Sequence, residues 1–181
     1  MHLLLSASKK KGTGKKMTQS RLQQPAARAV LTVLTVAVMI LIFVFSTETA
    51  EESDKTSGFF SDAVIRILHP AYDSYSRQEQ EKIYLDTQFA VRKAAHFTEY
   101  MILGALLRLC IESWTGKRKN LWLISWGAGM LYACTDELHQ LMTSGRSGQW
   151  QDVLLDGIGV LGGILVIRLL RRKRKGEETC P

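Results

Sequence analysis

The sequence predicts an all-α integral membrane protein, a helical bundle with four transmembrane helices. Three observations predict this fold class: long apolar segments, a segregated distribution of basic residues, and ionisable residues that recur at one level of the apolar segments. The chain has 181 residues, which is room for one domain. Its formal net charge of +7 is concentrated beside the apolar segments, which favours a membrane protein over a nucleic-acid-binding one.

The first predicted span covers residues 29–45. It contains 17 residues without a charged side chain, and a helix of that length extends about 26 Å, most of the hydrocarbon thickness of a bilayer. Residues 1–25 are predicted to be a disordered basic tail on the cytoplasmic side. Their single run of three leucines is far shorter than the apolar core of a secretory signal, which has about 7–15 residues. Met17 is an alternative start site.

The long connection at residues 46–93 is acidic, with nine acids against six bases and a net charge of −3. Apolar residues within it recur near helical spacing between Ser57, a suitable N-cap, and Pro70, a stop signal. This pattern predicts a short amphipathic helix on the outer membrane surface, with a re-entrant segment as the alternative. Farther along, "SRQE" at residues 76–79 fits a capping box, and its helix is expected to continue into the second span.

Three further spans are predicted at residues 94–111, 121–142 and 153–170. Each is apolar apart from a few ionisable or amide side chains. Together with the first span they make a membrane domain over residues 26–170, which a basic C-terminal tail follows at residues 171–181.

Basic residues set the predicted orientation. They gather in the N-terminal tail, in the turn at residues 117–119 and in the C-terminal run at residues 171–175. Four spans place all three on one side of the membrane, and basic residues mark the cytoplasmic side. Both termini are therefore expected in the cytoplasm, and the connections at residues 46–93 and 143–152 are expected outside.

Ionisable side chains are predicted to line one shared pocket. On each of the last three spans they lie in the outer third of the membrane and share a helix face, which on the last span also carries the close-packing pair Gly159 and Gly163. A charge at the centre of a lone membrane helix costs roughly 2.5–3.5 kcal/mol. The faces are therefore expected to converge on a polar pocket that opens to the outside.

The residues of this pocket divide by chemistry into acid–base candidates and binding candidates. The candidate catalytic residues are His96, Glu99, Asp136, Glu137, His139, Asp152 and Asp156. The candidate substrate-binding residues are Ser46, Arg92, Lys93, Tyr100, Gln140 and Arg146.

A metal site and simple ion pairing are two alternatives for these residues. Histidines and carboxylates recur at i, i+3 spacing on two of the spans, as they do in metal sites of helical bundles. The pairs are His96 with Glu99 and Asp136 with His139, to which Asp152 and Asp156 are added. Because three basic residues nearby are simpler counter-ions, the sequence predicts no metal and no other cofactor.

Several short motifs in this order resemble the VanZ-like family of bacterial membrane proteins. They are "FVFSTE" at residues 43–48, "RKAAHFTEYMILGALL" from Arg92 and "YACTDELHQLMTSGRSGQWQDVLLDGIGVLGG" from Tyr132. The resemblance extends over residues 29–168. It implies a multi-pass protein of the bacterial cell membrane, and the family's best-known member is linked to resistance to the glycopeptide antibiotic teicoplanin. The resemblance does not supply a mechanism.

Four functions are compatible with these residues. The first is an enzyme that acts on a lipid-linked or cell-envelope substrate at the outer leaflet, with His96 or His139 as the acid or base. The second is a protein that binds or shields an envelope precursor, or a glycopeptide-related ligand, without chemistry. The third is an ion or proton transporter, and the fourth is an ion-pair network that only fixes helix packing. The expected partners are the lipid bilayer and such a precursor, not nucleic acid.

Overall fold

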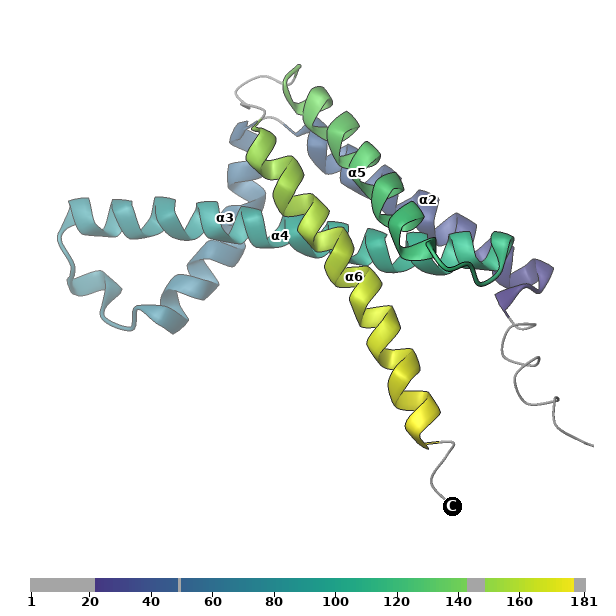
Figure 1. Cartoon of the computed structure of the whole chain (residues 1–181). Coiled ribbons are helices and arrows are strands. Elements are labelled where there is room, and N and C mark those ends of the chain that lie inside the picture. The colour runs from purple at the N-terminus through teal and green to yellow at the C-terminus, as the bar shows by residue number, and fades with distance from the viewer. Residues whose placement is uncertain (1–21, 49, 143–148, 178–181) are drawn as a thin grey trace, which may run out of the picture.

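The protein is all-helical in a computed structural model that describes residues 22–48, 50–142 and 149–177. No strand occurs in these ranges. The elements in chain order are α2 (Pro25–Thr47), α3 (Ala50–Leu68), a 3-10 turn η1 (Tyr72–Ser74), α4 (Arg77–Thr115), α5 (Leu121–Gln140) and α6 (Trp150–Glu177) (Figure 1). The predicted all-α fold class is confirmed.

Three described helices are long and apolar enough to cross a membrane: α2, α4 and the Trp150–Arg172 part of α6. Helix α5 is not among them. Two acids near its C-terminal end, Asp136 and Glu137, lower its apolar character. A membrane protein with three candidate spans is therefore supported, whereas the fourth span, the orientation of the termini and the domain limits remain predictions.

Helix α4 begins and ends with recognisable signals. The side chain of Ser76 accepts a hydrogen bond from the backbone N–H of Glu79 at 3.4 Å, and the Glu79 carboxylate accepts one from the backbone N–H of Ser76 at 3.0 Å. This confirms the predicted capping box. The helix then runs without a break for 39 residues to Gly116, whose φ of 72° suits a residue without a side chain.

Helix α3 starts earlier than the sequence suggested. Ser57 is not an N-cap, because it lies inside the helix and donates its hydroxyl proton to the carbonyl oxygen of Ser53 at 2.8 Å. Ser53, Ser57 and Ser61 are buried on a face of small residues, and α3 packs against α4. Phe59 and Ile67 are exposed on α3. The helix is thus two-faced, while its position on a membrane surface remains a prediction.

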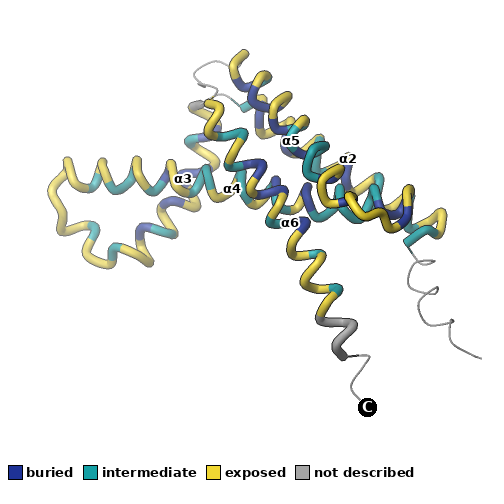
Figure 2. Tube along the Cα trace, viewed as in Figure 1, coloured by how far each residue is buried: buried dark blue, intermediate teal, exposed yellow. Residues whose placement is uncertain are grey.

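The core lies where α2, α4, α5 and α6 meet. Its buried residues are Ile42, Tyr100, Leu103, Ala133, Val160 and Ile164. Buried positions gather along the crossing of α4 and α6, whereas the hairpin formed by α3 and the first half of α4 projects away from it (Figure 2). Many apolar side chains on the outer faces of α2, α5 and α6 are exposed, as lipid-facing residues are.

Close approach of α4 and α6 depends on glycine. A Cβ atom at Gly163 would overlap the carbonyl oxygen of Met101, and one at Gly159 would lie 2.7 Å from the carbonyl oxygen of Phe97. The predicted close packing of this glycine pair is therefore present, and its neighbour is α4. The contact lies in the interior of both helices and holds them in a fixed relation, which positions the site described below.

Substitution of Gly163 by alanine is expected to lower the free energy of unfolding by about 1–3 kcal/mol, because the added methyl group forces two backbones apart. Gly162 is a matched control, since its Cβ would meet Met101 side-chain atoms at an ordinary 3.7 Å. Gly162→Ala should not lower stability and is expected to raise it by up to about 1 kcal/mol, the gain in helix propensity of alanine over glycine. Unfolding in mixed detergent micelles measures both, and equal effects would contradict the packing account.

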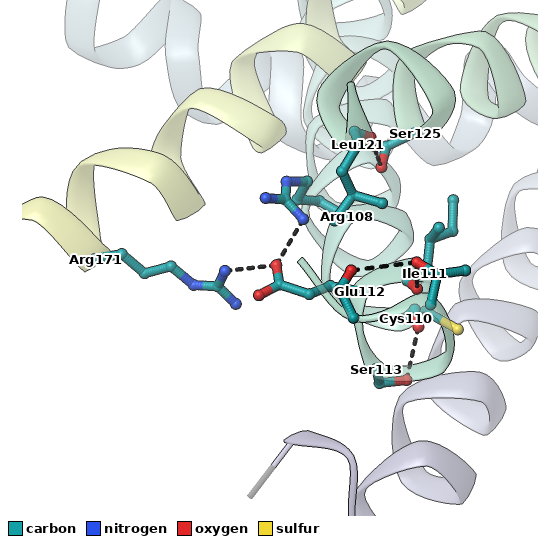
Figure 3. A network of polar contacts seen from close by, with 10 residues as sticks. Arg108, Cys110, Ile111, Glu112, Ser113, Leu121, Ser125 and Arg171 are labelled. Atoms are coloured by element: carbon teal, nitrogen blue, oxygen red, sulfur yellow. Dashed lines mark hydrogen bonds and ion pairs between the residues drawn. The ribbon is translucent and has the colours of Figure 1, made fainter. Parts of the chain in front are cut away.

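A buried carboxylate links α4 and α6 at the other end of their contact. Glu112 is 3% exposed, and its Oε2 accepts hydrogen bonds from Arg108 and Arg171, each at 2.6 Å (Figure 3). On α2, Arg28 donates to the carbonyl oxygen of Ser113 at 3.0 Å. These contacts tie the start of α2 and the end of α6 to the end of α4.

Candidate functional site

Three helices bring His96, Asp136 and Asp156 into one cluster. His96 comes from α4, Asp136 from α5 and Asp156 from α6, and one side-chain N or O atom of each lies within 4.8 Å of the others. Both aspartates are 2% exposed, and His96 is half-buried. We call these three residues the HDD cluster. The predicted convergence of ionisable side chains is present for these three residues.

Helical periodicity explains why the HDD cluster sits at the edge of the core. On α5, Asp136 follows the buried residues Gly129 and Ala133 at spacings of three or four residues. On α6, Asp156 lies one turn before the buried Val160, and on α4 His96 lies one turn before the buried Tyr100. Each ionisable group therefore lies on the buried apolar face of its helix. It could face lipid only if the whole helix rotated and exposed that face.

Within the described part of the chain, four buried side-chain atoms lack a hydrogen-bond partner, and two of them belong to the HDD cluster. They are Oδ1 of Asp136, Oδ1 of Asp156, the hydroxyl of Tyr100 and Oγ of Ser46. The Tyr100 hydroxyl is close enough to both aspartates to interact with them electrostatically. An unsatisfied buried polar group costs about 1–3 kcal/mol, and more when charged, so this end of the bundle carries a stability cost that packing does not explain.

The other Asp136 oxygen is held in place. Its Oδ2 accepts a hydrogen bond from Nε2 of Gln140 at 3.3 Å, one turn along α5. Tyr132, one turn earlier, donates its hydroxyl proton to the carbonyl oxygen of Met39 at 2.5 Å and so fixes α5 to α2. These contacts orient Asp136, whose other oxygen, Oδ1, is buried without a hydrogen-bond partner among the described residues.

Several of the other predicted site residues have structural partners. Lys93 pairs with Asp152, Arg92 pairs with Asp54 at 2.9 Å, and Glu137 accepts a hydrogen bond from the backbone N–H of Gln149. The first pair links α4 to α6 and the second links α4 to α3. These residues therefore contribute to helix packing, and the ion pairs of Arg92 and Lys93 are formed with residues outside the HDD cluster.

Three more of the predicted site residues lie outside the HDD cluster and do not form the ion pairs above. The imidazole of His139 packs against Phe43 with ring centroids 4.7 Å apart, which joins α5 to α2. Glu99 is half-buried on α4 and is not a member of the HDD cluster. Arg146 lies outside the described residues.

A surface hollow on the α3–α4 hairpin is separate from the HDD cluster. Its nearest α4 residue, Asp86, stands about 15 Å along the helix from His96, given the rise per residue. The lining residues are His69, Tyr75, Glu79, Lys82, Ile83 and Asp86. The outward-opening pocket at the cluster therefore remains a prediction.

Comparison with known proteins gives the chain a family. The model of the VanZ/LLP1 family matches residues 31–171. The chain belongs to the VanZ/LLP1 family. Neither curated proteins nor solved structures match the chain. All three residues of the HDD cluster lie inside the VanZ/LLP1 match, together with every predicted site residue.

The ion pair of Lys93 and Asp152 offers a test of structural against functional roles in this VanZ/LLP1 protein. Both side chains are a quarter exposed, so breaking the pair with Lys93→Met should cost about 1–2 kcal/mol, between the surface and buried values. The double variant Lys93→Met/Asp152→Leu should regain most of that free energy. A double-mutant cycle measures this, and a cycle with no coupling energy would contradict a structural pair.

Proposed function

We propose that this VanZ/LLP1 protein is a multi-pass protein of the bacterial cell membrane, with both termini in the cytoplasm, that acts on the head group of a lipid-linked cell-envelope substrate. The HDD cluster is the reacting centre, reached from the outer side. The observation that carries the proposal is the convergence of His96, Asp136 and Asp156 from three helices, with one unpartnered oxygen on each buried aspartate among the described residues.

Packing alone does not account for this cluster. The pairs Lys93–Asp152 and Arg92–Asp54 join helices and need no further explanation. The HDD cluster instead places two buried carboxyl groups together, and no described lysine or arginine forms an ion pair with either of them. Ionisable groups inside a membrane bundle are costly, and they are typical of functional sites when packing does not require them.

The residues suit acid–base chemistry. His96 is the acid or base, because an imidazole exchanges a proton near neutral pH. Asp136 and Asp156 orient the imidazole or the attacking water, and the Tyr100 hydroxyl lies beside them. Processing or masking of an envelope precursor would then alter the response to glycopeptide antibiotics, which is how the protein contributes to teicoplanin tolerance.

A deletion strain of the source bacterium tests this function. It is complemented with the wild-type protein, with His96→Gln, and with the exposed control Asp62→Asn on α3. Teicoplanin susceptibility and the envelope-lipid profile are measured at equal membrane levels of each protein. Wild type and the control should restore both properties. With His96→Gln, lipid conversion should be at least tenfold lower than with wild type. Full complementation by His96→Gln would overturn the catalytic role.

Binding without chemistry is the second candidate, and one observation favours it. Ser46 Oγ is fully buried, and no described residue forms a hydrogen bond with it, so no base activates this hydroxyl as a nucleophile. A shielding protein would retain a radiolabelled lipid-linked precursor in detergent without converting it. If the His96→Gln variant still retains the precursor and still confers antibiotic tolerance, shielding is favoured over catalysis.

A further inference from the structure

The HDD cluster has a donor set that bundle metal sites use. It offers one imidazole nitrogen and two carboxylate oxygens, one from each of three helices, all within 4.8 Å of one another. Ligand atoms around a tetrahedral ion stand about 3.4 Å apart, as bond lengths of about 2.0–2.2 Å require. Small side-chain rotations therefore bring all three atoms onto one ion.

We propose that His96, Asp136 and Asp156 bind one divalent first-row transition metal ion, for which Zn²⁺ is the probe. The inference concerns the occupant of the cluster and does not depend on which substrate the protein uses. It replaces the acid–base role of His96 whenever the ion is bound, because a metal-bound imidazole nitrogen cannot also exchange a proton; a water molecule on the ion would then supply the acid or base.

The acidic side chains of the HDD cluster favour a bound cation. The sequence favoured basic counter-ions over a metal, but Arg92 pairs with Asp54 and Lys93 pairs with Asp152. Neither of these basic side chains therefore forms an ion pair with the two buried aspartates. A divalent cation balances two carboxylates, and in a low-dielectric interior that balance is worth more than in water.

Buried aspartate oxygens without hydrogen-bond partners independently favour a metal ion. Oδ1 of Asp136 and Oδ1 of Asp156 are buried, and among the described residues neither has a hydrogen-bond partner. The Gln140 amide holds Oδ2 of Asp136 at 3.3 Å. This is how outer partners orient a metal-binding carboxylate, with one oxygen held and the other presented to the ion.

The donor types select the class of ion. Mg²⁺ and Ca²⁺ prefer oxygen ligands only, whereas imidazole suits Zn²⁺ and its first-row neighbours. Three protein ligands leave at least one coordination position for water or for a substrate oxygen. An anionic head group would approach two bare aspartates unfavourably, so the ion also makes the cluster suitable for such a ligand.

The test uses the full-length protein in mild detergent. The protein is stripped with EDTA, incubated with Zn²⁺, Mn²⁺ or Mg²⁺, desalted and analysed for metal content. Wild type should retain about one Zn²⁺ per chain, and its melting temperature should rise with Zn²⁺ concentration. Asp136→Asn and Asp156→Asn should weaken Zn²⁺ binding at least tenfold, while the exposed control Asp62→Asn should bind as wild type does.

Absence of stoichiometric Zn²⁺ or Mn²⁺ in folded wild type would overturn the proposal, as would equal metal content in the aspartate variants. Retention of Mg²⁺ alone would overturn the class of ion. If a variant does not fold, Co²⁺ replaces Zn²⁺ in wild type, where visible absorption bands of a nitrogen- and oxygen-ligated ion should appear and their absence would count against the site. The wild-type protein can bind metal while the His96→Gln variant still complements the deletion strain. That result would support the ion site and refute the catalytic function.

Discussion

Replacement of Glu112 by leucine should lower the free energy of unfolding by about 3 kcal/mol, within the range for a broken buried ion pair. Glu112 is 3% exposed and receives hydrogen bonds from Arg108 and Arg171. Leucine leaves the two arginines facing each other without their shared carboxylate. The expected cost lies at the lower end of the range, because Arg171 is partly exposed and can turn toward water.

The chain contains a matched control for this effect. Glu51 and Lys55 form an ion pair with the same i, i+4 spacing as Arg108 and Glu112, but their side chains are 81% and 73% exposed. Glu51→Leu should therefore change stability by less than about 0.5 kcal/mol. Both variants are measured by reversible unfolding in mixed micelles. Equal effects of the two would mean that burial of Glu112 does not matter.

Arg171→Gln separates the two partners of Glu112. This change removes the only described hydrogen bond between Glu112 and α6 and leaves the bond to Arg108 within α4. The expected cost is about 1–2 kcal/mol, the range of one hydrogen bond to a charged group. The free end of α6 should then become more accessible to protease, which reports the loss of the link between the two helices.

Helical periodicity allowed the sequence to predict which residues come together. His96, Asp136 and Asp156 each continue a buried stripe, and a stripe of spacing three or four is visible in any sequence. The capping box at Ser76 and the close-packing glycine at Gly163 were predictable for the same reason, because they depend on local spacing.

The choice of ionic partners was not predictable from the sequence. Lys93 could face Asp136, Asp152 or Asp156, and only the crossing of α4 and α6 selects Asp152. The sequence also predicts no role for Glu112, which lies beyond the predicted end of the second span at residue 111. Its importance depends on Arg171, 59 positions later in the chain.

Helix α5 shows how function and hydropathy conflict. Its apolar N-terminal half predicted a span, but Asp136 and Glu137 bring it below the apolar character of α2, α4 and α6. Both acids are buried against other helices rather than placed toward lipid. A helix in a membrane bundle can therefore be less apolar than its neighbours when its polar side chains face the other helices, because the bundle shields them from lipid.

Neutralising one aspartate of the HDD cluster should separate stability from function. In metal-free buffer, Asp156→Asn is expected to raise the free energy of unfolding by about 1–3 kcal/mol, the cost of an unsatisfied buried group. The asparagine amide removes one of two like charges and can donate a hydrogen bond to the unpartnered Oδ1 of Asp136. If the proposed function holds, the same variant should reduce conversion of a lipid-linked substrate at least about 100-fold, because a positioned catalytic group is lost.

Asp136→Asn should behave in the same way, and together the two variants discriminate between the proposed site and a structural ion network. A network that stabilises the bundle would become less stable when either carboxylate is neutralised, as Glu112→Leu does at the other end. The measurements are unfolding in mixed micelles with EDTA present and lipid conversion in membranes of the complemented deletion strain. A fall in stability for both variants, with lipid conversion unchanged, would mean that the HDD cluster serves packing. A functional site shows the opposite result, because it is less stable than a packed core and neutralising it costs activity.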